Sequence, residues 1–531
     1  MIYINQFFSN ISKSFRKLYL NSNIYDNRIS KKTSDYFFYK PSPHLLTSLI
    51  KYQKKRFKIN DFSIDDFDQK NLEKKEFDKL NCFNWLLSLD LKSEKKIIQS
   101  IILNWISINS KFNSKSWNFD LTAKRIIAWL SSHNLTFENS NENYKIRFNF
   151  IIQKQTNHLI NEIKNTDEIQ NKIEGCAAII LVGLCYKDKN NYLNFGLENL
   201  KKISKISLDN SGFPKSRNIK QLIFFLKYFI LIREWFKESQ NQIPEYIDET
   251  IFYLGQAYAF IWQNVNSNLL FNGNNNSDNS EFDNYLKRLG YKFKNNNLDY
   301  SGYVILRDKN TLLIMDIGST PNSEFTKNYQ SGALSFEILR KGKKLISNCG
   351  YFGKFDNKLN LISKSTASQS TLTIDDHSSN KINKSSLIDK GLKILKKETT
   401  FEKNYWKIIA SHDGYYKKYG SIHERKIEFF PEKMKFIGTD IINKKKKYNY
   451  KFDIRFHFEP NTKLMKTQDN KTILIELNDE GWKFTCENFE INIDNGLYFG
   501  NKNSYTENQN IYITGVTNHL VENIKWELTK I

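Results

Sequence analysis

Two polar side chains stand directly before apolar, strand-like stretches in the middle of the chain, between residues 329 and 376. Gln330 precedes the sequence SGALSFEIL, and Gln369 precedes STLTIDD. A glutamine amide donates and accepts hydrogen bonds but cannot relay a proton as an imidazole does. These two residues are therefore candidates for recognising a carboxylate or a hydroxyl group.

Residues that can carry a proton are concentrated further along the chain, in the sequence HDGYYKKYGSIHER. The candidate catalytic residues are His412, Tyr415, Tyr419 and His423, because imidazole and phenol groups titrate or relay protons. The HDGY part has a second explanation of equal weight, a turn in which the glycine bends the chain and the aspartate caps the bend. The other histidines outside RFHF, His377 among them, belong to no such constellation.

Cationic side chains recur with strand spacing in the same half of the chain. His423 and Arg425 are two residues apart, as are Arg455 and His457, so each pair lies on one face of its strand. Together with Arg217, at the start of a predicted helix, they predict a single basic cleft. The candidate substrate-binding residues are Arg217, Asn218, Gln330, Gln369, Arg425, Arg455 and His457.

The first half of the chain has the pattern of helices. Apolar stretches of helical length, separated by breaks rich in Asn and Ser, cover residues 93–108, 121–131, 144–163, 167–186, 217–236 and 244–265. Trp117 and Trp129 lie in such helices and are predicted as core residues. The helix from residue 217 is apolar on all sides, so we expect it to be buried on two sides. Residues 266–299 are predicted as a linker or loop that leads into the second domain.

After residue 300 the pattern changes to short alternating segments with Gly, Asn and Asp turns, among them YVIL, TLLIMDI, ALSFEIL, KFDIRFHF and IKWEL. This pattern indicates an antiparallel β-sandwich. ALSFEIL alternates as a half-buried strand, and Lys341-Gly342-Lys343 predicts a hairpin turn after it. The predicted fold class is therefore α+β multidomain, with an N-terminal arm over 1–80, a helical domain over 81–290 and a β-sandwich over 300–531.

Several motifs, taken in their order and spacing, resemble the heparinase II/III family of polysaccharide lyases. They are WNFDLTAKRIIAWL, GALSFEI with ISNCG, STASQSTLTIDD, HDGYYKKYGSIHER, RFHFEP and GWKF. The resemblance covers nearly the whole chain after residue 80. It implies an incomplete α/α toroid for the helical half, and it implies cleavage of an acidic, uronate-containing glycan by β-elimination.

β-Elimination needs a group that neutralises the uronate carboxylate, a base for the C5 proton and an acid for the leaving oxygen. The resemblance implies a histidine before each motif strand, where this chain has Gln330 and Gln369. Recognition of a carboxylate or hydroxyl group and a relic of a lost site are explanations of equal weight for these glutamines. An Asn-His pair of the family reads Gln170-Asn171-Lys172 here, and a Tyr-His pair reads Ile219-Lys220. Because glutamine is a poor metal ligand, neither a metal ion nor another cofactor is predicted.

The sequence thus supports two functions of different classes. The first is a polysaccharide lyase of heparinase II/III type that acts on an acidic glycan in a cleft between the domains. The alternative is a catalytically inactive glycan-binding protein of cell-envelope polysaccharide biogenesis. A glycoside hydrolase would need two carboxylates about 5–10 Å apart, and the sequence identifies no such pair.

The composition agrees with a polyanionic partner. Lys and Arg outnumber Asp and Glu by 80 to 57, a formal net charge of +23. This charge suits an acidic polysaccharide, although a bias toward A/T-rich codons explains it equally well. Nucleic-acid binding would rest on net charge alone, so an acidic polysaccharide is the predicted partner.

The sequence gives few signals of location. The five cysteines, Cys82, Cys176, Cys185, Cys349 and Cys486, form no CxxC pair and predict buried free thiols. No cleavable signal peptide is visible, and the longest apolar runs fall short of the roughly 20 residues that span a bilayer. A cytoplasmic location is the default expectation, and the resemblance implies the periplasm or cell envelope as the alternative. Nothing in the sequence indicates the oligomeric state.

Overall fold

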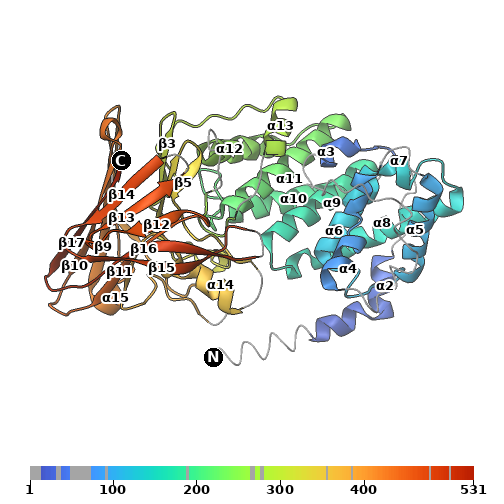
Figure 1. Cartoon of the computed structure of the whole chain (residues 1–531). Helices are drawn as coiled ribbons and strands as arrows, with labels where there is room; N and C mark the ends of the chain where they lie inside the picture. Colours follow the sequence, from blue (N-terminus) through green and yellow to red (C-terminus); the bar gives the residue numbers. More distant parts are fainter. Residues whose placement is uncertain are drawn as a thin grey trace. The chain divides into compact units, whose positions relative to one another are not determined.

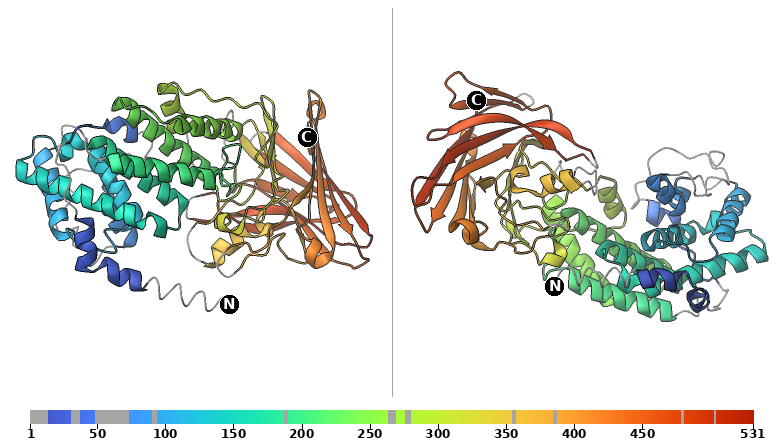
Figure 2. Two further views of the ribbon diagram at one scale, coloured as in Figure 1. Left: turned by 180° about the vertical axis from the view of Figure 1, so that it is seen from behind. Right: turned by 90° about the horizontal axis from the view of Figure 1, so that it is seen from below.

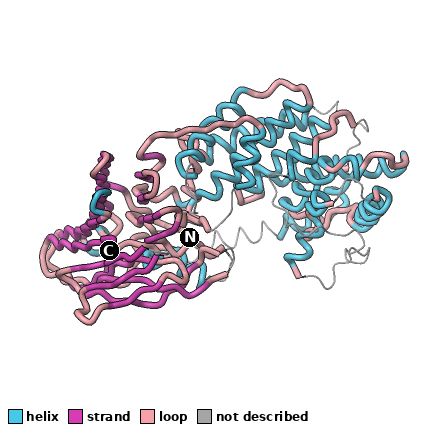
Figure 3. Tube along the Cα trace, turned by 45° about the horizontal axis from the view of Figure 1, so that its top comes forward, coloured by secondary structure: helices cyan, strands magenta, loops and turns pink. Residues whose placement is uncertain are grey.

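The computed structural model describes residues 14–30, 37–47, 73–89, 94–186, 190–262, 269–275, 280–353, 357–383, 387–477, 480–501 and 504–531. Within them the long helices precede residue 290 and the named strands follow it, with only short helices among the strands (Figures 1 and 3). The predicted fold class, a helical region followed by antiparallel β-sheets, is confirmed. The predicted N-terminal arm lies partly outside the described residues.

The helical region is built from helices of very different burial. Its helices are α2 (Asn23–Ile29), α3 (Pro43–Thr47), α4 (Lys74–Asn81), α5 (Lys95–Ile108), α6 (Phe119–Ser131), α7 (His133–Thr136), α8 (Glu142–Glu162), α9 (Ile169–Cys185), α10 (Asn190–Ser207), α11 (Ile219–Glu238), α12 (Glu245–Trp262) and α13 (Ser280–Arg288). Helix α9 is apolar on all sides and packs against α6, α8 and α10 (Figure 2). A helix of this kind must be enclosed, and α9 is therefore the centre of the helical core. No helix in the described residues is long and apolar enough to cross a membrane.

Two helices of nine residues or more lie where the sequence pattern predicted none. Helix α10 fills a stretch left unassigned, and α13 lies inside the predicted linker. In α10 only Tyr192 and Leu200 are buried among the large apolar side chains. One-sided burial leaves a narrow apolar stripe, which is easily missed in a sequence rich in Asn and Lys.

Aromatic side chains fill the helical core. The rings of Trp105 and Trp129 meet edge to face with centroids 5.5 Å apart, and Trp117 is buried as well. The buried guanidinium of Arg125 lies 4.1 Å from the Trp105 ring centroid. Trp117 and Trp129 are thus core residues, as predicted, but Trp117 lies in the turn before α6 and not in a helix. All five cysteines are buried and none forms a disulfide, which confirms the predicted free thiols.

The strands form three antiparallel sheets (Figure 3). The five-stranded sheet has the order β1 (Asp299–Tyr300), β2 (Tyr303–Arg307), β3 (Thr311–Asp316), β4 (Phe336–Arg340), β5 (Lys343–Ile346). The eight-stranded sheet has the order β12 (Lys463–Lys466), β13 (Thr472–Leu477), β14 (Glu480–Cys486), β17 (Val521–Lys530), β10 (Lys435–Lys444), β9 (Ser421–Phe430), β8 (Tyr405–His412), β7 (Ile394–Glu402). The four-stranded sheet has the order β15 (Glu490–Tyr498), β16 (Thr506–Val516), β11 (Lys451–His457), β6 (Leu372–Ile374).

One hydrophobic core joins all three sheets. At its centre the Phe336 ring of β4 stacks on Trp526 of β17 with centroids 5.6 Å apart. Phe456 of β11 meets the same Trp526 ring edge to face, at 4.9 Å. Each large side chain buried in this way contributes roughly 1.5–3 kcal/mol, so the sheets are held together as one body.

Strand β4 differs from its prediction in one respect. It begins at Phe336, and every residue in it is buried, so it is not half-buried. The inner polar residue, Glu337, is tolerated because it pairs with the buried Lys344 at 3.1 Å. The hairpin turn is confirmed, since Lys341 and Gly342 have φ values of 47° and 78°, as a two-residue type I′ turn requires.

The chain divides into two compact units. The first, the helical unit, comprises Met1–Ser207, Phe224–Phe252 and Ser280–Lys292. The second, the β unit, comprises Leu208–Ile223, Tyr253–Asn279 and Phe293–Ile531. The β unit therefore includes two segments from the helical half of the sequence, and both carry side chains of the site.

Candidate functional site

Arg217 anchors the first of these segments to the five-stranded sheet. Its Nη1 donates to Asp316 Oδ1 at 2.8 Å, and its Nη2 donates to the Gly302 carbonyl at 2.7 Å. The guanidinium carbon lies 4.5 Å from the Tyr303 ring centroid. Burial opposes the charge, but Asp316 outweighs it and the pKa of Arg217 is raised. Arg217 is thus a permanently charged structural anchor.

Two glycines leave the space that this anchor occupies. A Cβ on Gly318 would lie 2.1 Å from Cζ and 2.3 Å from Nη2 of Arg217. A Cβ on Gly302 would lie 2.9 Å from the same Nη2. Any larger residue at either position would have to displace the guanidinium.

Residues 269–275, which were predicted to be part of a linker, are buried and bonded to the same sheet. The Leu270 N–H donates to the Glu337 carboxylate, at 3.2 Å from Oε1. Asn272 Nδ2 donates to Asp316 Oδ2 at 2.9 Å. Residues 269–275 form an irregular loop, as predicted, but this loop is buried, because its Asn side chains make polar contacts inside the protein in place of facing solvent.

Gln330 connects this segment to two others. Its Oε1 accepts a hydrogen bond from the Gly273 N–H at 3.0 Å. Its Nε2 donates to the Gly350 carbonyl at 3.0 Å and to the Ser363 carbonyl at 2.6 Å. The side chain is 1% exposed. The amide therefore has its oxygen and both N–H groups in use.

Gln369 lies beside the same carbonyl, with its Nε2 3.4 Å from Ser363 O. The next residue, Ser370, donates its N–H to Asn348 Oδ1 at 2.8 Å. Asn348 Nδ2 is buried and has no hydrogen-bond partner among the described residues. Neutral amides are poor metal ligands, and the described residues include no group of three or more His, Cys, Asp or Glu side chains able to bind a metal ion.

Side chains above Gln330 extend the site toward the surface. Asn275 Nδ2 donates to the Tyr351 carbonyl at 2.6 Å, and Tyr351 Oη donates to Asn328 Oδ1 at 2.9 Å. The exposed Lys220 places its Nζ 3.5 Å from Asn275 Oδ1. We call Asn272, Asn275, Asn328, Gln330 and Gln369 the amide cluster. Most of these amides are buried and bonded within the protein, and the half-buried Asn328 and the exposed Lys220 lie at the rim of the cluster, where an amide and a cation suit hydroxyl and carboxylate groups.

The histidines proposed for catalysis lie in a different network, inside the eight-stranded sheet. His412 on β8 and His423 on β9 are directly opposite each other, with His423 Nδ1 3.3 Å from His412 Nε2. His423 Nε2 lies 2.7 Å from Asp440 Oδ1. All three side chains are buried.

The hydrogen bonds of this network define where its protons lie. The Gly414 N–H donates to His412 Nδ1 at 3.0 Å, so the proton of His412 is on Nε2. This Nε2–H donates to His423 Nδ1, and His423 in turn donates its Nε2–H to Asp440. Burial lowers the pKa of both imidazoles, which are therefore neutral with every ring nitrogen in use.

Asp440 is the charged centre of the network. Arg425 donates to it through Nε at 2.7 Å and Nη2 at 3.1 Å, and Trp526 Nε1 donates at 3.0 Å. Burial opposes ionisation, but Arg425 outweighs it, and the pKa of Asp440 is lowered. This fully buried ion pair positions strands and leaves no atom free for a substrate.

The two tyrosines of the same motif have separate environments. Tyr415 is buried and donates its hydroxyl to the Leu372 carbonyl at 2.7 Å. Tyr419 Oη lies 2.9 Å from Nδ1 of the exposed His377, which the sequence analysis placed in no constellation. Of the four catalytic candidates, only Tyr419 therefore has a titratable partner at the surface.

The predicted single basic cleft does not form. Arg455 Nη1 donates to Asn510 Oδ1 at 3.1 Å, while His457 lies 3.2 Å from the Cys349 sulfur and 2.9 Å from the Ala367 carbonyl. Arg217 and Arg425 are each bound to an aspartate of their own. The physical reason is that a buried cation without a partner is costly, so folding pairs each one separately.

Two further candidates also have structural partners. Asn218 Oδ1 accepts the Gln221 N–H at 3.1 Å and so caps α11. Burial of His457 lowers its pKa to about 3, so this imidazole is neutral.

Lys364, the last residue of α14 (Asn357–Lys364), is a titratable group that the sequence analysis missed. It follows Ser363, and its Nζ donates to the Lys327 carbonyl at 2.8 Å. The side chain is buried. Burial, aided by the nearby Lys327 charge, lowers the pKa of Lys364 to about 8. A partly neutral amine thus lies beside the amide cluster.

The helical unit has a titratable group of its own, near the stretch that replaces the family's Asn-His pair. Glu174 is buried and accepts a hydrogen bond from Tyr228 Oη. Lys124 Nζ lies 3.6 Å from the same carboxylate. Burial is the main cause that raises the pKa of Glu174. This group is built entirely from helices α6, α9 and α11.

The family of the β region follows from its sequence. Residues 292–527 match the family model described as heparinase II/III-like, C-terminal. This region is a heparinase II/III-like C-terminal domain. No curated protein sequence matches the chain.

Solved structures extend the likeness to nearly the whole chain. A heparinase III gene product with methylated lysines has a TM-score of 0.70 at 13% identity, covering 94% of this chain and 87% of its own. A mutant of heparan sulfate lyase HepC from Pedobacter heparinus has a TM-score of 0.67 at 14% identity, covering 94% and 84%. Another heparinase III has 0.68 at 16% identity, covering 96% and 89%. The chain therefore has a heparinase III-like fold.

Proposed function

We propose that this chain recognises an acidic glycan through its heparinase II/III-like fold, at the amide cluster, without catalysing β-elimination there. The similar solved structures include a heparan sulfate lyase, which supports an acidic polysaccharide as the ligand class. The formal net charge of +23 favours association with such a polyanion.

The hydrogen bonding of Gln330 is the observation that carries this proposal. Its oxygen accepts from Gly273, and its nitrogen donates to Gly350 and Ser363. An amide locked in this way neither titrates nor rotates to take up a proton. At the position where the resemblance implies a histidine, the chain thus has a group that organises backbone around a binding site.

A second candidate function is the lyase itself, favoured by Lys364. Its pKa of about 8 leaves a fraction of the amine neutral near pH 7. A neutral amine beside Gln330 and Gln369 is able to accept the C5 proton of a bound uronate. In this mechanism the amides and Lys220 would balance the substrate carboxylate.

One experiment separates the two functions. The purified chain is incubated with heparan sulfate, alginate and polygalacturonate, while calorimetry measures binding and ultraviolet absorbance measures the unsaturated product of elimination. We expect binding of at least one polymer and no product. Product formation would overturn the proposal in favour of the lyase, and Lys364→Met should then lower turnover on the order of a hundredfold. Absence of binding to all three polymers would also overturn it.

A charge reversal locates the binding. Lys220→Glu removes the exposed cation at the rim of the amide cluster and should weaken binding about tenfold. Lys237→Glu is the matched control, because Lys237 is also exposed and also lies on α11. Equal affinities of the two variants would show that the glycan binds elsewhere.

A further inference from the structure

A second surface of the β unit combines tyrosines with lysines. It consists of residues 416–420, which contain α15 (Tyr416–Tyr419), and residues 445–451, which are the loop that joins β10 to β11 and the first residue of β11 (Figure 1). These two segments contain four tyrosines, six lysines and no acidic residue. We call them the tyrosine–lysine patch. It shares no residue with the amide cluster.

Specific contacts hold the two segments together. The Lys445 N–H donates to the Gly420 carbonyl at 3.0 Å, and Tyr450 Oη donates to the Tyr419 carbonyl at 3.2 Å. The rings of Tyr419 and Tyr450 meet edge to face with centroids 4.9 Å apart. The loop is fixed from below by the buried Lys444, whose Nζ donates to the Tyr448 carbonyl at 2.8 Å. The patch is therefore one continuous surface.

Aromatic rings and ammonium groups alternate across the patch. Tyr416 is 38% exposed and Tyr448 is 57% exposed, so both rings are accessible to a ligand. Lys445 Nζ lies 4.7 Å from the Tyr416 ring centroid, and Lys418 Nζ lies 5.1 Å from that of Tyr419. A sugar ring can pack its C–H face on a tyrosine while an ammonium group binds its sulfate or carboxylate.

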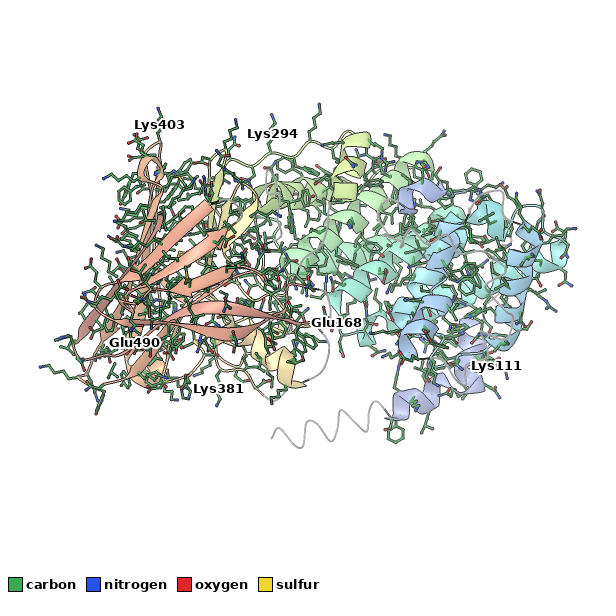
Figure 4. All side chains as sticks on the ribbon, in the orientation of Figure 1. Lys111, Glu168, Lys294, Lys381, Lys403 and Glu490 are labelled. Atoms are coloured by element: carbon green, nitrogen blue, oxygen red, sulfur yellow. The ribbon has the colours of Figure 1, made fainter. Side chains whose placement is uncertain are left out.

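Most of the charge of the patch has no carboxylate partner. Lys451 lies 3.6 Å from Asp453, but Lys417, Lys418 and 445–447 form no ion pair with a carboxylate within the described part of the chain. The other acidic residues at its edge are Asp375, which accepts the Lys451 N–H at 2.9 Å, and Asp376. Other lysines of the β unit, such as Lys381 and Lys403 in Figure 4, are exposed without being grouped with tyrosines in this way.

We infer that the tyrosine–lysine patch is a second binding surface for an acidic glycan, which takes up sugars outside the amide cluster. The choice of a glycan rests on the proposed function, because the fold is that of glycan-binding proteins. The rings supply stacking and the lysines supply charge, so both terms should contribute to affinity. Nucleic acid is the competing polyanion.

The test compares three variants of the full chain by affinity electrophoresis in gels that contain heparan sulfate, alginate or double-stranded DNA. The charge variant is Lys445→Glu/Lys446→Glu/Lys447→Glu. The control, Lys381→Glu/Lys390→Glu/Lys403→Glu, has the same net charge and changes three exposed lysines elsewhere on the β unit. The aromatic variant is Tyr416→Ala/Tyr448→Ala. Thermal melts verify that each variant is folded.

We expect the charge variant to bind the acidic glycan at least about tenfold more weakly than the control, and the aromatic variant to lose several-fold with its charge unchanged. Equal weakening in the charge variant and the control would overturn the inference, since net charge alone would then explain binding. Preferential loss of DNA binding would overturn it in favour of a nucleic-acid surface. The Lys220→Glu variant tests the amide cluster independently. If it shows that no glycan binds at the amide cluster, the expected results for the patch variants stay the same.

Discussion

Two buried arginine–aspartate pairs in the β unit resemble each other in chemistry and differ in what they join. Arg425 and Asp440 are directly opposite each other on the neighbouring strands β9 and β10. Arg217 and Asp316 are 99 residues apart in sequence, and they join the start of α11 to the end of β3. The first pair lies within one sheet, and the second holds a distant segment against another sheet.

The Arg425–Asp440 network chiefly stabilises the fold, whereas the Arg217–Asp316 network also supports the candidate site. Asp440 is also bonded to His423 and Trp526 of adjacent strands, while Arg425 Nη1 donates to the Leu334 and Ser370 carbonyls at 2.9 and 2.7 Å. The side-chain partners of this pair all lie in the eight-stranded sheet, so its loss should chiefly lower the stability of that sheet. Asp316 instead also binds Asn272 of the amide cluster. Disturbing the second pair should therefore affect glycan binding as well as stability.

Replacing Asp440 should give the largest effect of all. Asp440→Asn leaves the guanidinium of Arg425 buried without a charged partner, which costs about 3–5 kcal/mol. Urea unfolding followed by circular dichroism measures the loss. The control is Asp494→Asn, because the side chain of Asp494 is 53% exposed and lies 3.5 Å from Arg455. That variant should change the free energy of unfolding by about 1 kcal/mol or less, and equal losses would contradict the structural role of the buried pair.

A methyl group placed against the Arg217–Asp316 pair should cause a smaller loss of stability and should also weaken glycan binding. In Gly318→Ala the new methyl group meets the guanidinium of Arg217 at 2.1 Å, so the anchor must shift, at a cost of about 1–3 kcal/mol. Gly481→Ala is the control, since its nearest neighbour would be Ile531 at 3.9 Å. Glycan affinity should fall in Gly318→Ala and stay constant in Gly481→Ala. A fall in stability without any fall in glycan affinity would show that Arg217 does not support the glycan-binding site.

The two networks also differ in how much of each could be predicted from the sequence. Period-two alternation placed His423 and Arg425 on one face of a strand, and the burial pattern of β9 has both of them inward. Alternation identifies the members of a face, but it does not say whether the face meets solvent or a second sheet. The inward direction follows from the sandwich, in which strands from all three sheets share one core.

The long-range network left weaker traces in the sequence. Asp316 ends an otherwise apolar strand, and an acidic residue at the end of TLLIMD was a usable signal of a buried partner. Nothing local indicates that this partner is Arg217, or that Asn272 joins them, because contacts between residues far apart in sequence leave no periodic pattern. The resemblance pointed to Gln330 and Gln369, while their hydrogen bonds required the structure.

The smallest predicted effect is that of acid. A lower pH should destabilise the network of His412, His423 and Asp440 but not the Arg217–Asp316 network. His412 and His423 have pKa values lowered by burial, whereas an unfolded chain titrates its histidines near about 6.5. Below that pH the unfolded state binds more protons than the folded state, so stability falls as the pH falls. Each such imidazole contributes up to about 1.4 kcal/mol per pH unit. The Arg217 network contains no histidine and contributes nothing to this slope.

The slope is obtained by measuring the free energy of unfolding in urea at several pH values between 6.5 and 5. His412→Asn should reduce the slope by about 1.4 kcal/mol per pH unit, one imidazole's share. The exposed His519 serves as the control, and His519→Asn should retain the slope of the natural chain. Other buried imidazoles, such as His457, contribute alike to both variants, so the difference between them isolates His412. The pKa of Asp440 is lowered from a value near about 4. The stability that Asp440 contributes is therefore lost only at pH values below this window. Identical slopes in the two variants would mean that His412 already takes up its proton in the folded sheet, and the neutral hydrogen-bond chain to Asp440 would then be incorrect.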